Sequence, residues 1–434
     1  MQFSGNKTRA EINLEALRHN LNEIKKITPL KTKIIAVVKA NAYGHGAKEI
    51  SLELQRNGVD WFAVFNAHEA IALRSFGIVG NILMFGQNND VPCDVLKKHN
   101  ITQTVFSQTS AENLQNECEK AQIIQDVHIK IDTGMGRLGF VYSGKEEQHN
   151  AVKKIYSYKN LNVTGIYTHL SHADGNVESA KEYTKLQWKR FETLINELQK
   201  CNINVGMTHI QNSAGVITTS INSDLSNCEN LGKDNSCTND ILPSNNTECK
   251  DNSYTKNIFT SNNTECNEKG FSPLGVRVGI ALYGVGDFEN PNINLKPVME
   301  LKSTISMIKT VEKGEYIGYS QNYITPHEMK IATVPIGYAD GYPRALSNRG
   351  YALIGGKRAK ITGNICMDQI MLDVTDIDAY EGQTVTLFGH DNNNYIKAEE
   401  LAKLTNTIGY EIVCRIGDRV HRKTVRGSVE KQRL

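Results

Sequence analysis

The fold of this chain is decided by an apolar run and the residues that follow it, Ile34-Ile35-Ala36-Val37-Val38-Lys39-Ala40-Asn41-Ala42-Tyr43-Gly44-His45-Gly46. Its first five residues are apolar without alternation, which is typical of a parallel strand that is buried on both faces. Further short apolar segments follow as far as residue 285. The eight predicted strands are Lys33–Val38, Trp61–Phe65, Ile82–Phe85, Gln103–Phe106, Val127–Asp132, Val163–His169, Met207–Gln211 and Gly275–Tyr283.

The segments between these strands have the periodicity of amphipathic helices. Apolar residues recur every three or four positions in two clear cases, Leu14, Leu17, Leu21 and Ile24, and then Trp188, Phe191, Ile195 and Leu198. Eight strand–helix units over about 275 residues predict a (β/α)8 TIM-type barrel, an α/β fold. A doubly wound open sheet has the same order of elements and remains the alternative.

Beyond residue 290 the pattern changes to strands with glycine-rich turns. A helical pattern is clear only at Ala398–Leu404. We therefore expect a barrel over residues 11–285, and a mostly β C-terminal domain formed by residues 286–434 together with residues 1–10. The strands predicted in this domain are Ser303–Val311, Lys330–Pro335, Tyr351–Ile354, Ala359–Ile361, Ile370–Val374 and Thr384–Phe388.

One interval, residues 221–270, breaks this rhythm. It contains twelve Asn and four Cys, and its segment Ser244–Cys249 recurs as Ser261–Cys266. A segment of this composition buries little apolar surface, so we interpret it as a disordered insertion. It precedes the eighth strand, which places it at the bottom of a barrel, whereas active sites use the top. We expect the insertion to be dispensable for chemistry.

Composition and charge argue against several classes of protein. The 434 residues include 49 Lys and Arg against 47 Asp and Glu, a net charge of +2, whereas nucleic-acid binders usually carry a basic surplus. No apolar run is long enough to span a membrane, and the first residues lack the apolar core of a signal peptide. The nine Cys show no zinc-ligand spacing, so we expect reduced thiols, no metal site and a cytoplasmic location.

The chemistry of the opening stretch centres on Lys39, which ends the first predicted strand and so lies at the top of the predicted barrel. Burial lowers the pKa of a lysine because the charged form loses its water, and the neutral amine is a nucleophile. Such an amine forms a Schiff base with a carbonyl cofactor. The alternative is a strand-end lysine whose charged head extends into water.

This stretch resembles the alanine racemase family, in which the lysine that binds pyridoxal 5′-phosphate has the same sequence context. Further segments match the family in order along nearly the whole chain, apart from 221–270. The resemblance implies a barrel, a β domain, a head-to-tail homodimer with shared active sites, and interconversion of L- and D-alanine. The matching segments are Lys130–Gly139, Tyr167–His169, His209–Ala214, Arg277–Gly284, Gly318–Ser320, Gly337–Ala345, Cys366–Gln369 and Tyr410–Glu411.

Racemisation removes the α-proton from one face of the amino acid and returns a proton to the other, so it needs an electron sink and two bases. The resemblance implies that Lys39 is the base for the D-isomer on the pyridoxal-phosphate aldimine. It also implies that Tyr319 of the partner subunit is the base for the L-isomer. A free tyrosine titrates near 10, so Tyr319 needs cationic surroundings to act near neutral pH.

The resemblance assigns further residues to the cofactor and the substrate. Arg277 faces the ring nitrogen, with His169 and His209 beside it, and the permanent charge of an arginine disfavours protonation of that nitrogen. Alone, each would be an ordinary salt bridge or a core histidine. Lys130 matches a position that some members carbamylate. The phosphate-binding residues are Tyr43, Ser213, Gly279, Ile280 and Tyr410, and the substrate-binding residues are Arg137, Met367 and Tyr338.

The chain departs from the family at Val278, Ser320 and Asn364, where many or some members have Pro, Gly and Arg. None of these changes removes a predicted catalytic group. Three other functions remain as alternatives: a racemase of serine or of several amino acids, a barrel-type pyridoxal-phosphate decarboxylase, and a non-enzymatic cofactor carrier. A decarboxylase is expected to place a carboxylate, and not Arg277, at the ring nitrogen.

Overall fold

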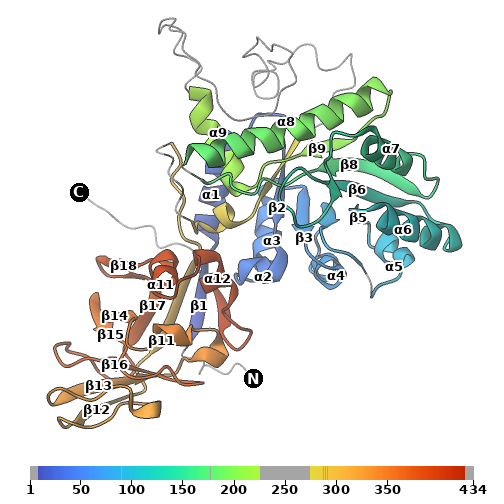
Figure 1. The fold of residues 1–434 in the computed structure, drawn as a ribbon. Helices are drawn as coiled ribbons and strands as arrows, with labels where there is room; N and C mark the ends of the chain where they lie inside the picture. Colours follow the sequence, from blue (N-terminus) through green and yellow to red (C-terminus); the bar gives the residue numbers. More distant parts are fainter. Residues whose placement is uncertain are drawn as a thin grey trace, which may run out of the picture.

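The computed structural model describes residues 8–425, apart from 89, 176, 225–273, 287, 289 and 291. Figure 1 shows two units, a barrel in blue to green and a β unit in orange to red. The barrel strands are β2 (Lys33–Val37), β3 (Trp61–Val64), β4 (Asn81–Met84), β5 (Ile101–Val105), β6 (Gln125–Asp132), β8 (Leu161–Tyr167), β9 (Met207–His209) and β10 (Leu274–Val278).

These eight strands are parallel and form a closed ring. Each pairs with the next, β5 pairs with β6, and β10 pairs with β2 to close the circle. An open sheet would leave two unpaired edges, so the closed ring excludes the doubly wound alternative and confirms the predicted barrel. A short strand, β7 (Phe140–Val141), adds to β6 outside the ring.

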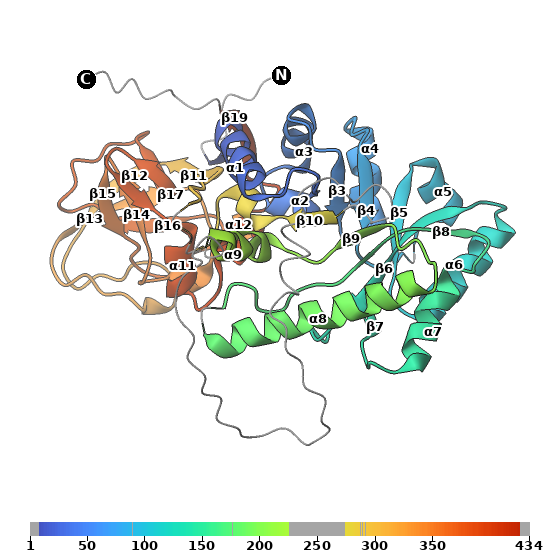
Figure 2. The same cartoon turned by 90° about the horizontal axis from the view of Figure 1, so that it is seen from above.

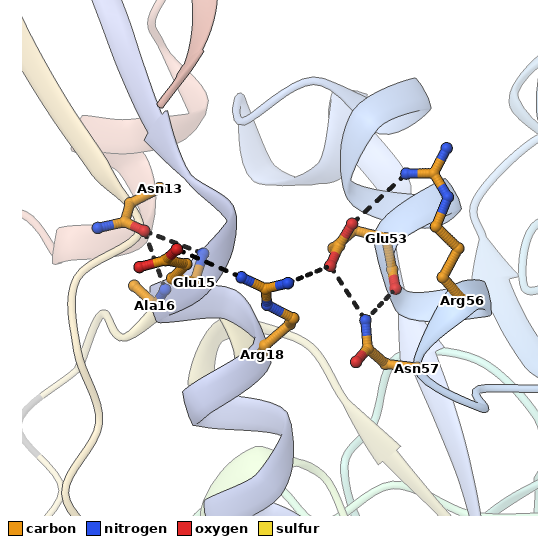
Figure 3. A network of polar contacts seen from close by, with 7 residues as sticks. All are labelled: Asn13, Glu15, Ala16, Arg18, Glu53, Arg56 and Asn57. Carbon is orange, nitrogen blue, oxygen red and sulfur yellow. Dashed lines mark hydrogen bonds and ion pairs between the residues drawn. The ribbon is translucent and has the colours of Figure 1, made fainter. Parts of the chain in front are cut away.

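Helices surround the barrel, as Figure 2 shows. The helix α1 (Leu14–Ile27) is capped by Asn13, whose side chain accepts hydrogen bonds from the backbone N–H groups of Glu15 and Ala16. Figure 3 shows Arg18 of α1 reaching Glu53 of α3 (Ala47–Arg56), which fixes these two helices to each other. The other barrel helices are α4 (Ala67–Ser75), α5 (Cys93–Lys98), α6 (Gln108–Lys120), α7 (Glu146–Ile155), α8 (Glu178–Lys200) and α9 (Ser213–Asp224).

The eighth strand is shorter than predicted. The prediction Gly275–Tyr283 is wrong beyond Val278, because Ile280–Tyr283 form a 3₁₀ helix, η2. At Gly279 the backbone has φ −120° and ψ −90°, which lies outside the strand region and turns the chain out of the sheet. The apolar run continues through the turn because η2 is itself buried.

The second unit is mostly β, as predicted. Its larger sheet has the strand order β15-β14-β17-β11-β1-β19, with β18 on β17, and its smaller sheet has the order β12-β13-β16. The elements are β1 (Arg9–Asn13), β11 (Met299–Thr304), β12 (Met307–Val311), β13 (Met329–Val334), β14 (Tyr351–Ile354), β15 (Lys357–Lys360), β16 (Ile370–Asp373), β17 (Thr384–Asp391), β18 (Asn394–Ile396), α11 (Ala398–Leu404), α12 (Gly409–Cys414) and β19 (His421–Val425).

Two details of this unit differ from the prediction. The single strand predicted at Ser303–Val311 is wrong, because the chain passes from β11 in one sheet to β12 in the other at Ile305 and Ser306. The domain limits stay predictions, although β1 places Arg9–Asn13 in the sheet of the second unit. The insertion predicted at 221–270 lies outside the described residues from 225 onward.

Two further observations concern the described residues only. Five cysteines lie among them, and all five are free thiols. Across the same residues, no helix has both the length and the apolar character that crossing a membrane requires.

Candidate active site

Lys39 begins a turn with an unusual backbone. The four residues Ala40–Tyr43 have φ between 52° and 54°, which is the left-handed helical region. This conformation costs non-glycine residues roughly 1–2 kcal/mol each, so the surrounding structure must hold it. The carboxylate of Glu69 accepts the Ala40 N–H at 2.6 Å, and the side chain of Asn41 accepts the Ala47 N–H at 2.7 Å. The strain marks this turn as a functional segment.

The second unit holds the other end of the turn. Gly44 has φ 81°, and a Cβ there would lie 2.2 Å from the carbonyl oxygen of Val413 in α12. The Nε of Arg422 donates to the Gly44 carbonyl at 3.0 Å, while its Nη1 donates to the Val420 carbonyl at 2.8 Å. The lysine turn is therefore fixed between the barrel and the C-terminal segment.

The amine of Lys39 is half-buried. Burial is the largest cause of its lowered pKa, and the positive charge of Arg137 lowers the pKa further. Glu69 and Cys414 act in the opposite direction. The amine therefore loses its proton more easily than a free lysine does, as an amine needs to do before it can act as a nucleophile or a base.

Arg277 lies in β10 and is 3% exposed. Its Nη1 donates to Nδ1 of His209 at 2.6 Å and its Nη2 donates to Nδ1 of His169 at 3.2 Å. Carbonyl oxygens of Thr168, His209 and Ile210 accept further bonds. Among the residues that the structure describes, Nε of Arg277 has no acceptor. Burial lowers the pKa of Arg277 to about 10, so the group remains charged at neutral pH.

Both histidines bonded to Arg277 are neutral. Burial, followed by the charge of Arg277, holds the pKa of His169 and of His209 well below the usual range. His209 also stacks on Tyr167, with ring centroids 4.6 Å apart. The sequence reasoning missed a third member, His128, whose Nδ1 lies 2.9 Å from Nε2 of His209. The sequence does contain a sign of this position. His128 and Lys130 are two residues apart on β6, so their side chains lie on the same face of the strand and point into the barrel together.

Lys130 is buried in the barrel interior, 5.4 Å from the ring centre of Tyr167. Burial, with the charge of Arg277, lowers its pKa to about 7. The neighbouring Asp132 accepts the backbone N–H groups of residues 134–137, at 2.8–3.1 Å. These bonds hold the loop that carries Arg137 at the open top of the barrel.

A second cluster lies where β10 turns into η2. A Cβ at Gly279 would lie 2.6 Å from the Tyr43 hydroxyl oxygen, and the Ser213 hydroxyl accepts the Gly279 N–H at 3.0 Å. The Tyr410 ring from α12 has its centre 6.3 Å from that of Tyr43. The N–H of Ile280 has no acceptor in the described part of the chain. Hydroxyl groups and an unpaired backbone N–H therefore face one another at this turn, and both are donors that an anion can accept from.

The remaining predicted residues lie apart from the barrel group. Tyr319, Tyr338 and Met367 belong to the second unit and are 69%, 43% and 52% exposed. The backbone N–H of Tyr338 donates to the Cys366 carbonyl at 3.1 Å, and Cys366 and Tyr319 line one cavity of about 300 Å³. This cavity is built on β12, β13 and β16, which both views place at the end of the second unit away from the barrel (Figures 1 and 2).

Comparison with known proteins shows which family the chain resembles. The family model "Alanine racemase, N-terminal domain" matches residues 12–228, and "Alanine racemase, C-terminal domain" matches residues 298–424. The alanine racemase of Clostridium novyi (strain NT) is 36% identical over 430 residues, which is 98% of this chain and 97% of the relative.

Solved structures agree with the sequence comparison. A structure of alanine racemase from Clostridium difficile 630 is 34% identical, covers 97% of this chain and 96% of its own, and superposes with a TM-score of 0.79. A structure of alanine racemase from Bartonella henselae "with covalently bound pyridoxal phosphate" is 25% identical, covers 97% of this chain and all of its own (100%), and has a TM-score of 0.72.

Proposed function

The chain belongs to the alanine racemase family and interconverts L- and D-alanine, and we propose that it uses pyridoxal 5′-phosphate and one base from each of two copies of the chain. The observation that carries this proposal is the position of Lys39. Its amine, with a lowered pKa, follows β2 at the top of a closed barrel, and the neighbouring strand β10 presents Arg277.

The described residues fit this cofactor in three ways. Arg277 retains a free donor at Nε, which suits an acceptor atom such as a pyridine nitrogen. Ile280 retains a free N–H beside the hydroxyl groups of Tyr43 and Ser213, which suits a phosphate. Burial and the charge of Arg137 lower the pKa of Lys39, Lys130 and Arg277, and an anionic ligand would relieve this repulsion. The name of the Bartonella henselae structure also supports the choice of cofactor.

When bound, pyridoxal 5′-phosphate supplies an electron sink that makes the α-proton of the amino acid acidic. The chain then has to hold, remove and return that proton. We propose that Lys39 holds the cofactor until the substrate replaces it, after which its free amine moves the proton on the D-isomer face. The left-handed turn and the hydrogen bonds that fix it, from Ala40 to Glu69 and from Arg422 to Gly44, hold the amine in one place during this exchange.

We propose that Tyr319 of a second copy moves the proton on the opposite face. Its exposed position and its separation from the barrel group support this assignment, since a base that belongs to its own barrel would be buried there. The exposed second-unit group then completes the barrel group of a partner, as it would in a homodimer with shared active sites. Met367 and Tyr338 would enter the partner's site together with Tyr319.

The cationic residues divide the remaining work. We propose that Arg277 contacts the ring nitrogen through Nε and, being charged, discourages protonation of that nitrogen. The neutral imidazoles of His169 and His209 and three backbone carbonyl oxygens accept its other hydrogen bonds. Arg137 binds the substrate carboxylate, because a guanidinium bonds a carboxylate through paired N–H groups. The phosphate is held by Tyr43, Ser213, Tyr410 and the N–H groups of Gly279 and Ile280.

Lys130 is proposed as a carbamylated lysine. Carbamylation requires a neutral amine that attacks CO₂ and then releases one proton to solvent, and burial with a pKa of about 7 supplies such an amine near neutral pH. The product carries a negative charge near Arg137 and Arg277, which reduces the surplus of positive charge.

The cysteines concern the location of the protein. The free thiols of the described residues support a reducing, cytoplasmic location, which we also propose.

The first test replaces Lys39. Lys39→Ala should abolish racemisation of alanine and should leave no cofactor that borohydride can fix to the chain, as read by intact mass. The matched control is Lys33→Ala, since Lys33 is an exposed lysine at the start of the same strand. A cofactor still fixed to the chain in Lys39→Ala would contradict the assignment. Racemisation measured over several amino acids then defines the substrate range.

A further inference from the structure

Three buried side chains form one hydrogen-bonded series inside the barrel. Nη1 of Arg277 lies 2.6 Å from Nδ1 of His209, and Nε2 of His209 lies 2.9 Å from Nδ1 of His128. The three residues are 3%, 1% and 0% exposed, so bulk water does not reach them. The proposed function uses Arg277 and His209 and assigns nothing to His128.

The series has only one consistent placement of protons. An arginine has donors and no acceptor, so Nδ1 of His209 must be the acceptor of its bond with Arg277. A neutral imidazole carries one proton, which therefore sits on Nε2 of His209. That proton points at His128, so Nδ1 of His128 must also be an acceptor. The proton of neutral His128 then sits on its own Nε2.

The surroundings of His128 keep it in this acceptor state. Burial, followed by the charge of Arg277, lowers its pKa to about 3, so it stays neutral throughout the working range of an enzyme. Its Nε2 is buried without a partner among the described residues. A Cβ at Gly165, the register partner of His128 on β8, would lie 2.6 Å from that atom. The His128 ring is thus confined by its neighbours. Its Nε2–H stays unpaired, while its Nδ1 faces His209 as an acceptor.

We propose that His128 is a positioning residue, which shares with Arg277 the task of fixing the His209 tautomer, because it pairs the Nε2 proton and so helps to keep an acceptor opposed to Nη1 of Arg277. Without it, the Nε2 proton of His209 would be buried and unpaired, which costs about 1–3 kcal/mol. That cost works against the bond to Arg277 and narrows the free-energy gap between the two His209 tautomers, so that part of the population carries the proton on Nδ1, where it would oppose an arginine N–H. Arg277 would then shift away from the position that holds Nε toward the cofactor. This last consequence rests on the proposed function, whereas the tautomer does not.

The test compares two substitutions in the full-length protein as purified. His128→Leu removes the acceptor, and His128→Asn keeps one, because the Asn carbonyl oxygen occupies nearly the place of Nδ1. Magic-angle-spinning ¹⁵N NMR with labelled histidine reads the protonation of each ring nitrogen, and the His209 signals are identified by their loss in His209→Asn. We expect wild type and His128→Asn to carry the His209 proton on Nε2, and His128→Leu to move it wholly or partly to Nδ1.

Two results would overturn the proposal. One is a wild-type His209 that carries its proton on Nδ1 or on both nitrogens, a reading that needs no variant to fold. The other is an unchanged His209 in His128→Leu and in His128→Phe, a second substitution that fills the site without an acceptor. For kinetics, His128→Leu should lower kcat for alanine about tenfold with KM nearly unchanged, and His128→Asn should restore it. If the His209 tautomer shifts in His128→Leu but the wild-type protein does not racemise alanine, the proposed function is wrong while the inference about the tautomer stands.

Discussion

The two groups of site residues differ in how the chain holds them. His209 and Arg277 are buried among the barrel strands and bonded to each other and to backbone, and burial shifts the pKa of both and of Lys39. Tyr319, Tyr338 and Met367 stand largely exposed on the second unit. A buried group has its chemistry set within one chain, whereas an exposed tyrosine acquires a special environment only from something that covers it. This difference supports the proposal that one chain contributes its buried group to one active site and its exposed group to the active site of a second copy.

The exposed half offers the largest expected effect. Tyr319→Phe should slow exchange of the α-hydrogen of L-alanine by about 10²–10⁴-fold, the usual contribution of a general base. Cofactor content and melting temperature should stay at wild-type values, because the hydroxyl of an exposed ring contributes little to folding. Deuterium exchange followed by NMR measures the rate.

The control is Tyr380→Phe, an equally exposed tyrosine of the second unit outside the proposed site. Equal exchange rates in both variants would remove Tyr319 from the mechanism and with it the contrast between the two halves.

The role of Arg277, in the buried group of residues, can be tested through a side reaction, the transamination of alanine. Arg277→Glu places a carboxylate beside the proposed position of the ring nitrogen, and a carboxylate would favour protonation of that nitrogen where Arg277 would disfavour it. The rate of racemisation should fall. The ratio of pyruvate formed by transamination to alanine racemised should rise by about tenfold or more. Arg277→Lys keeps the positive charge and should not raise the pyruvate yield. A yield unchanged by the carboxylate would refute the proposed role of Arg277.

A smaller effect concerns stability and pH. Lys130 has a folded-state pKa of about 7 against 10.5 for a free lysine, so between these values the folded state binds fewer protons than the unfolded state. The free energy of unfolding contributed by this group must therefore rise with pH across that window. Lys130→Met should remove this rise, and chemical denaturation at pH 7 and pH 9.5 in CO₂-free buffer measures it. Equal pH dependence in wild type and Lys130→Met would show that the amine is not perturbed.

Much of the barrel could be predicted from the sequence because buried parallel strands are short apolar runs. The pattern failed where an apolar run leaves the sheet, as at Gly279, and where a run passes between two sheets, as at Ile305. Strand β19 was not predicted, since its residues are polar and it is held by pairing with β1. The left-handed turn at Ala40–Tyr43 could not be predicted either, because ordinary residues adopt it only under tertiary constraint.

The candidate site was predicted unevenly for a related reason. Its residue types came from the resemblance to the family, and the structure brings the barrel residues together. His128 was missed although its spacing from Lys130 shows which face of the strand it occupies, because that spacing does not show its partner His209, which lies on another strand. Arg422 was missed because its role depends on a carbonyl far away in the sequence.

The central claim, that one active site draws Lys39 and Tyr319 from different copies, is tested most directly by mixing two inactive variants. Lys39→Ala and Tyr319→Phe are refolded together in equal amounts, and racemisation of alanine is compared with that of each variant alone. In a twofold dimer, half of the random assemblies are mixed and each has one intact site, so about a quarter of wild-type activity should return. A mixture as inactive as its two components, with mixed dimers shown by mass spectrometry, would contradict the account.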